Sequence, residues 1–253
     1  MKTISRIGVI IVALLLVSTS EQPVTFTVGE WEPFTGSSLP GKGIASEIVS
    51  AVCSEARIPI QIKFMPWTRA EKLVFEGQAF ASFPYAKNED REAKYNFSDP
   101  IFYTTTQFAY YSALRDFSSL RITSWADVKP HKVAYLSGSV FEKAMKDAGI
   151  TVILVADIEN AVRMLQAGRV DLIVDEPAVY LTAIRKLFPN EVDKFKLVDS
   201  PLFGPPIPVH LMVSRTYPHA AALLARINAG LAVLKTNGTL AGFAKRYGIR
   251  VNP

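Results

Sequence analysis

Four short segments of this chain carry the side chains best suited to binding a charged molecule or to moving a proton. Each segment follows an apolar run, and together they contribute aromatic, cationic, small and acidic residues: Trp31 and Phe34, Tyr85 and Arg91, Gly138 and Ser139, and Asp175 and Glu176. A guanidinium can hold a carboxylate through two parallel hydrogen bonds, and a carboxylate can serve as a general acid or base. The set as a whole indicates a site for a small charged ligand.

The SGSVFE segment suggests a way to hold an anion. Ser139 stands three residues before Glu142, which is the spacing of a capping box, so we expect Ser139 to cap a helix. Gly138 allows a close backbone approach, and the free N–H groups at a helix start attract anions. A plain helix cap without a ligand explains the same residues. The position of the segment after a strand, opposite the segment of Arg91, favours the anion site.

The acidic and aromatic candidates also have ordinary structural explanations. Asp175 and Glu176 precede Pro177, and a proline is common in the first turn of a helix, so the two acids could simply cap one. Trp31 and Phe34 follow a strand and could belong to the core. Their shared placement at strand ends supports the functional interpretation, because ligands of open α/β sheets bind outside the carboxyl ends of the strands.

Two successive α/β units must position these segments. Strand-like runs occur at residues 24–28, 60–64, 79–83, 132–136, 151–155 and 170–174. Helical patterns separate them, at residues 44–56, 67–77, 140–149 and 158–168. This β-α-β-α-β order, used twice, predicts two mostly parallel sheets covered by helices.

The last part of the chain is expected to return to the first unit. A strand pattern at 208–214 precedes two helical patterns, the second ending at Gly248. Pairing of this strand with the first sheet would cover an exposed edge. The chain then crosses twice, near 108–113 and 203–209, and a hinge results. We therefore predict two lobes: residues 21–108 with 209–253, and residues 109–208.

The first twenty residues resemble a secretory signal peptide. A short basic start precedes eleven apolar residues, and Ser18 and Ser20 suit cleavage before Glu21. The apolar run is too short to span a bilayer, which needs about 20 residues. Because no cysteine lies near the cut, a lipid anchor is not expected. We predict an exported protein that acts in the periplasm.

Composition argues against several other classes of function. After loss of Lys2 and Arg6 the chain has 26 basic and 23 acidic residues without a basic block, so nucleic-acid binding is not expected. The three histidines are scattered, so neither a metal site nor another cofactor is predicted. The single cysteine, Cys53, lies in a helical pattern and is expected to be a small buried apolar residue, not a reactive thiol.

The chain resembles the bacterial extracellular solute-binding proteins of family 3, the amino-acid-type receptors of ABC importers. The resemblance extends roughly from Val24 to Gly248. Within the family, the chain is similar to a divergent branch. It rests on the order and spacing of several motifs: EWEPF, GKGIASEIV, PWTRAEKLVFEG, EDR followed by FSDPIF, SWADVKPHKVAYLSGS, AGRVDLIVDEP and LKTNGTLAGFAKRYG. It implies a two-lobed, type II periplasmic-binding-protein-like α/β fold with two crossover strands and the ligand in the cleft.

The resemblance also implies roles for individual residues. Arg91 corresponds to the arginine that grips the ligand carboxylate, and Ser139 with the amides after Gly138 corresponds to the second-lobe anchor of the same group. Trp31 corresponds to the aromatic residue that covers the ligand side chain. In this branch Trp67 could line the pocket together with Arg69, although packing at a helix start explains Trp67 as well.

The expected partner of a ligand amino group is less complete. The acid in this role corresponds to Glu176 by its spacing from Asp171, or to Asp175 by the similarity around DEP. The FPYA segment stands where the family often has Ser or Thr before the arginine, and Val28 stands where an acid is usual. A carboxylate ligand is therefore better supported than an α-amino acid.

We expect a monomeric, non-catalytic receptor that delivers a small carboxylate-bearing solute to an inner-membrane ABC permease, with sensing as a variant of this role. The ligand contacts would be the eight residues named above and Trp67. The rival hypothesis is an enzyme on the same scaffold, similar to cyclohexadienyl dehydratases. In that case Asp175, Glu176 or Glu30 would be the acid or base.

Overall fold

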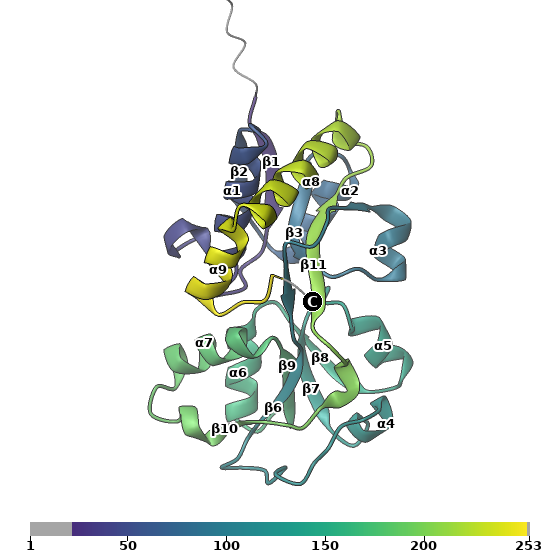
Figure 1. Ribbon diagram of the computed structural model, residues 1–253. Coiled ribbons are helices and arrows are strands. Elements are labelled where there is room, and N and C mark those ends of the chain that lie inside the picture. Colours follow the sequence, from purple (N-terminus) through teal and green to yellow (C-terminus); the bar gives the residue numbers. More distant parts are fainter. Residues whose placement is uncertain (1–21, 252–253) are drawn as a thin grey trace, which may run out of the picture.

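A computed structural model describes residues 22–251, which form two α/β lobes stacked on one another (Figure 1). Each lobe surrounds one mixed sheet. Near the end of the described residues, Arg250 forms a β-bridge with Tyr103. The proposed signal peptide, residues 1–20, lies outside the described residues. Within residues 22–251, no helix has the length and hydrophobicity needed to cross a membrane.

The first lobe contains the sheet with strand order β2-β1-β3-β11-β4, and β5 pairs with β11. Its strands are β1 (Val24–Val28), β2 (Ile60–Phe64), β3 (Ala81–Tyr85), β4 (Asn96–Phe97), β5 (Phe102–Thr104) and β11 (Ile207–Val213). β1 runs parallel to β2 and β3, whereas β11 is antiparallel to β3. The predicted return of the late strand to the first sheet is therefore confirmed.

The second lobe contains the sheet with strand order β10-β6-β9-β7-β8. Its strands are β6 (Gln107–Tyr111), β7 (Lys132–Leu136), β8 (Thr151–Val155), β9 (Leu172–Asp175) and β10 (Phe195–Leu197). β7 is parallel to β8 and β9, and β6 is antiparallel to β9. The chain changes sheets between Thr104 and Gln107 and again between Leu197 and Ile207. The exact lobe limits near residues 108 and 208 stay a prediction.

Helices flank the two sheets (Figure 1). The first lobe carries α1 (Ile44–Glu55), α2 (Trp67–Phe75), α3 (Glu89–Lys94), α8 (Ala220–Thr236) and α9 (Thr239–Tyr247), with the short 3-10 helix η1 (Pro40–Lys42). The second carries α4 (Trp125–Val128), α5 (Glu142–Asp147), α6 (Ile158–Gln166), α7 (Pro177–Leu187), η2 (Val192–Lys194) and η3 (Pro201–Phe203). Gly248 ends α9 in a left-handed conformation, as its sequence position predicts.

β3 lies two residues further along the chain than the sequence pattern indicates. The predicted strand ended at Phe83. Pro84, the next residue, has no N–H to donate to a neighbouring strand. The observed strand passes through Pro84 because its pairing with β1 ends at Ser82. On the other side, pairing with β11 is irregular between His210 and Met212. This extension brings Tyr85 to the end of the strand.

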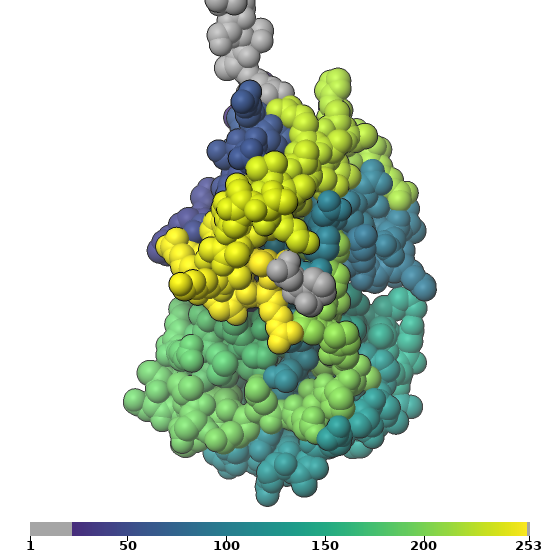
Figure 2. Space-filling view, viewed as in Figure 1, coloured from purple at the N-terminus to yellow at the C-terminus, as the bar shows by residue number. Residues whose placement is uncertain are grey.

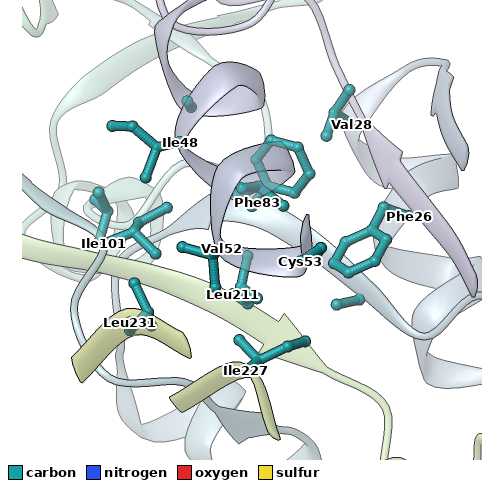
Figure 3. Close-up of a cluster of buried hydrophobic side chains, with 14 of the residues drawn as sticks. Phe26, Val28, Ile48, Val52, Cys53, Phe83, Ile101, Leu211, Ile227 and Leu231 are labelled. Atoms are coloured by element: carbon teal, nitrogen blue, oxygen red, sulfur yellow. The ribbon is translucent and has the colours of Figure 1, made fainter. Parts of the chain in front are cut away.

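The first-lobe core joins β1, α1, β3, β11 and α8 (Figure 3). Phe26 from β1, Leu211 from β11 and Ile227 from α8 all point into this cluster and are buried. Cys53 of α1 belongs to the same cluster, and burial raises the pKa of its thiol to about 12. Its predicted role as a small buried apolar residue is confirmed. Separate apolar clusters fill the two sides of the second sheet.

Ile227 provides a test of this core. It is fully buried on α8, whereas Val233 on the same helix is 41% exposed. Ile227→Ala should lower the free energy of unfolding by about 2–5 kcal/mol, because it removes buried methyl groups and leaves a cavity. Val233→Ala should change it by less than about 1 kcal/mol. Urea unfolding followed by circular dichroism measures both, and equal losses would contradict the described packing.

Candidate functional site

A cavity of about 100 Å³ lies between the two lobes. The first lobe contributes Trp31, Trp67, Pro84, Tyr85, Ala86, Arg91, Ile207 and Val209; the crossover contributes Thr104, Thr105 and Thr106; and the second lobe contributes Tyr135, Leu136, Ser137, Gly138, Ser139, Val140, Asp175 and Glu176. Eight of the nine residues predicted from the sequence therefore meet in one cavity. Figure 2 shows that the C-terminal segment, in yellow, covers part of the lobe junction on one face.

Trp31 forms one wall of the cavity and is held there by a stack of rings. Its ring stacks on Phe34 with centroids 4.6 Å apart, and Phe34 stacks on Phe102 of β5 at 5.2 Å. Phe34 is only 4% exposed and does not line the cavity. The expectation that Phe34 contacts the ligand is therefore corrected: it supports Trp31 from behind, because the chain turns sharply after β1 and directs this ring into the core.

Trp67 and Tyr85 form a second aromatic wall. Trp67 is the first residue of α2, and its indole lies against Gly29 so closely that a Cβ there would come within 2.3 Å of it. Its Nε1–H donates to the carbonyl of Glu30 at 3.3 Å. Tyr85 meets Trp67 edge to face with centroids 5.7 Å apart. Trp67 thus fulfils both alternatives considered from the sequence, since it packs at a helix start and also lines the cavity.

Arg91 is a buried cation at the cavity, not a surface residue. It belongs to α3, whose start is capped by Asn88, and it is 7% exposed. The guanidinium lies over the Tyr85 ring at 4.6 Å. Nη1 donates to the carbonyl of Ala86 at 2.8 Å, and Nη2 donates across the cleft to the carbonyl of Gly138 at 2.5 Å. These bonds use two of the five N–H donors of the side chain, so Arg91 retains donors for an anionic ligand.

The expected helix cap at Ser139 is wrong. α5 begins only at Glu142, and Phe141 is the residue that precedes it. The carboxylate of Glu142 instead accepts the N–H of Gly138 at 2.7 Å, which holds the intervening residues in a turn outside the helix. Gly138 has φ +79°, a conformation that favours glycine. Gly138 and Ser139 still line the cavity, but they belong to a turn in which the carbonyl of Gly138 accepts a hydrogen bond from Arg91.

Asp175 connects the second lobe to the first. It ends β9 and is 7% exposed. Its Oδ1 accepts the indole N–H of Trp31 at 3.0 Å and the backbone N–H of Glu176 at 2.7 Å. Burial raises the pKa of Asp175 to about 7, and these two donors offset only part of that effect. Asp175 is therefore a carboxyl group that can change its charge near neutral pH.

Glu176 forms hydrogen bonds with Thr105 in the segment that crosses between the lobes. Its carboxylate accepts the backbone N–H of Thr105 and also the Thr105 hydroxyl, the latter at 3.0 Å. Burial raises the pKa of Glu176, although hydrogen bonds from Thr105 partly oppose this shift. Asp175 and Glu176 both line the cavity, so each of the two alternatives from the sequence keeps its place at the site.

The sequence reasoning missed the threonines of the crossover. Thr104, Thr105 and Thr106 line the cavity between β5 and β6. Three consecutive threonines just before the predicted crossing were the available signal. Tyr135 was also missed: it ends up beside the cavity because it lies near the carboxyl end of β7, and its hydroxyl accepts the N–H of Phe141 at 3.3 Å. Among residues 22–251, no group of three or more side chains is arranged to hold a metal ion.

Comparison with known proteins identifies similar solute-binding proteins. A model of the bacterial extracellular solute-binding proteins, family 3, matches residues 25–250. The L-cystine-binding protein TcyA of Bacillus subtilis (strain 168) is 26% identical over 230 residues, which is 87% of this chain and 79% of the relative.

Solved structures of other proteins share the fold. A histidine kinase sensor domain with similarity to periplasmic binding proteins has a TM-score of 0.76 and 19% identity, covering 90% of this chain and 97% of its own. An ancestral arginine-binding protein bound to arginine has a TM-score of 0.72 and 24% identity, covering 90% and 99%. At these identities the structural likeness establishes the fold, the type II periplasmic-binding-protein-like arrangement.

The raised pKa of Asp175 predicts an unusual pH dependence of stability. Because its pKa in the folded protein, about 7, exceeds that of the unfolded chain, the folded state binds the extra proton between about pH 4 and 7. Stability from this group is present below pH 4 and is lost as the pH rises through 7, by up to about 4 kcal/mol. Asp175→Asn keeps an Oδ1 acceptor for both donors but cannot ionise.

Urea unfolding at pH 5 and pH 8 measures this effect. We expect the wild-type protein to lose stability relative to Asp175→Asn over this interval. Asp116→Asn is the control: hydrogen bonds from Ser118 lower the pKa of the exposed Asp116 carboxyl, so this group does not titrate between pH 5 and 8 and the variant should keep the pH dependence of the wild type. An identical pH dependence for the wild type and Asp175→Asn would contradict a buried, proton-binding carboxyl group at this position.

Proposed function

Because the chain belongs to the bacterial extracellular solute-binding proteins, family 3, we propose that it captures a small carboxylate-bearing solute, an amino acid or a close relative, in the cleft between its lobes. The protein would be exported to the periplasm, act as a monomer and deliver the solute to an inner-membrane ABC permease. L-Cystine binding by the relative from Bacillus subtilis supports a ligand of the amino-acid class.

The observation that carries this proposal is the buried guanidinium of Arg91. It is the only cation among the residues that line the cavity in the described part of the chain. Its planar group is fixed by Tyr85, Ala86 and Gly138, so little side-chain freedom remains to be lost when a ligand binds. An arginine arranged in this way suits bidentate recognition of a carboxylate.

The acids complete the charge pattern of the site. Asp175 and Glu176 line the cavity with Arg91, which gives two carboxyl groups and one guanidinium. A solute with its carboxylate at Arg91 could place a cationic group toward either acid. Trp31 and Trp67 offer apolar surface for the remaining part. A solute that contacts both lobes binds the closed arrangement more tightly and so shifts the protein toward it.

The raised pKa of Asp175 is also compatible with an enzyme on the same scaffold. Asp175 has its pKa raised to about 7 by burial, and a general acid or base works best with a pKa near the operating pH. An enzyme would convert the bound molecule, whereas a receptor would return it unchanged. Mass spectrometry of the solute recovered after incubation decides between the two roles.

A thermal-shift screen of residues 21–253 tests the proposed function. The panel should hold amino acids including L-cystine and L-arginine, and each should be matched with the amine that lacks its carboxylate. A ligand that binds only the folded state stabilises it by about 2.7 kcal/mol at a hundredfold excess over its dissociation constant. We expect shifts from acids and none from the matched amines. Equal shifts from both members of a pair would contradict a carboxylate site.

Arg91 should dominate the affinity for the solute found in that screen. Arg91→Ala leaves a desolvated carboxylate without its partner, which costs about 2–5 kcal/mol, so the dissociation constant should rise about 30-fold or more. Arg91→Lys keeps the charge and should recover part of the loss. Isothermal titration calorimetry measures both variants. Lys94→Ala, at an exposed position of the same helix, is the control. Unchanged affinity in Arg91→Ala would overturn this role.

A further inference from the structure

The hydrogen bond between Trp31 and Asp175 is placed to hold the lobes together. The donor Nε1 lies in the first lobe and the acceptor Oδ1 in the second, 3.0 Å apart, in a partly buried setting. Within residues 22–251 it is one of two side-chain hydrogen bonds that cross this cleft, the other being that from Arg91 to Gly138. Both are made by the protein with itself, so neither depends on contact with a solute.

The position of this bond ties it to the crossover. Phe102, in the crossover-adjacent strand β5, stacks on Phe34, and Phe34 stacks on Trp31. On the other side, Asp175 is paired in register with Gln107, the first residue of β6. β5 and β6 are the two ends of the same crossing segment. The bond therefore closes a ring of contacts that begins and ends at the crossover, and opening the lobes must break it.

Apolar contacts surround the same junction. Val179 of α7, in the second lobe, is fully buried within the core cluster of the first lobe. Ile158, Ala178 and Val140 of the second lobe pack against that cluster as well. Apolar surroundings strengthen the hydrogen bond, because a hydrogen bond is worth more in a low-dielectric setting.

The titratable groups near Asp175 come from its own lobe, whereas Trp31 comes from the opposite lobe. These groups are Glu176, which directly precedes α7, Tyr180 from α7, and Tyr135 from β7. Glu176 is itself acidic and is engaged with Thr105. Trp31 is thus the side-chain donor that Asp175 uses in the described structure, and it comes from the opposite lobe.

We propose that Trp31 is a positioning residue whose indole N–H latches the lobes in the closed arrangement by donating to Asp175. The latch rests on the proposed function for its biological meaning, because a more populated closed form binds solute more tightly and releases it more slowly. Closure of the lobes in the absence of solute can be measured independently of that function. The role lies in the N–H and not in the aromatic surface of the ring.

Small-angle X-ray scattering without added solute provides the first test. Trp31→Phe keeps a ring that can stack on Phe34 but removes the N–H, so the radius of gyration should rise as the lobes separate. Trp67→Phe is the matched control for closure, because the Trp67 N–H donates to Glu30 within its own lobe. Equal radii for the wild type and Trp31→Phe, or equal increases in both variants, would overturn the latch.

Variants of the acceptor separate the latch from a general effect on folding. Asp175→Asn retains the Oδ1 acceptor and should stay closer to the compact wild-type radius than Asp175→Leu, which accepts no hydrogen bond. Trp31→Phe should add nothing further to Asp175→Leu, since both remove the same bond. Additive increases in the radius of gyration would contradict the proposal. Melting curves of all variants confirm that the proteins compared are folded.

Solute binding gives the second readout. With a solute identified by the thermal-shift screen, Trp31→Phe should weaken affinity about tenfold or more, mainly through faster dissociation. An unchanged dissociation rate would overturn the functional part of the latch. If no solute on the panel binds, the proposed function fails, while the scattering comparison still decides whether the latch exists.

Discussion

The antiparallel pairing of β11 with β3 is the constraint on which the cleft depends. The strand follows all of the second lobe in sequence, yet it lies in the middle of the first sheet. The chain must therefore cross between lobes twice, and the two crossings are brought side by side because β5 also pairs with β11. This arrangement joins the two lobes by two neighbouring segments and places strand ends of both sheets around one cavity.

The interior of that cavity is governed by charges that are costly to bury. Arg91 is compensated by two carbonyl groups and the face of Tyr85, and Glu176 by the backbone and hydroxyl of Thr105. Asp175 accepts hydrogen bonds from Trp31 and from the N–H of Glu176, and these offset only part of the effect of burial, which raises its pKa. A pre-formed guanidinium and an incompletely compensated carboxyl group line the same cavity, which suits a small solute that carries the opposite charge for each.

Local patterns allowed most of the fold to be predicted. β1, β2, β7 and β8 have the bounds that were predicted for them. Each consists of five consecutive residues whose apolar character is visible in the local sequence. The site was predictable only as a set of strand ends. Phe34 was misjudged because nothing local distinguishes a ring that faces the cleft from one that turns under Trp31. The Ser139 cap failed because Glu142 has another N–H within reach, that of Gly138. The contact from Trp31 to Asp175 joins residues 144 positions apart, so no local pattern contains it.

A crystal structure of residues 21–253 with the solute identified by thermal shift tests the central claim most directly. We expect the solute between the lobes, with its carboxylate oxygens about 2.7–2.9 Å from the guanidinium nitrogens of Arg91, the range of charge-assisted hydrogen bonds. Asp175 and Trp31 should flank it from opposite lobes. A solute bound outside the cleft, or within it with its carboxylate directed away from Arg91, would contradict the account.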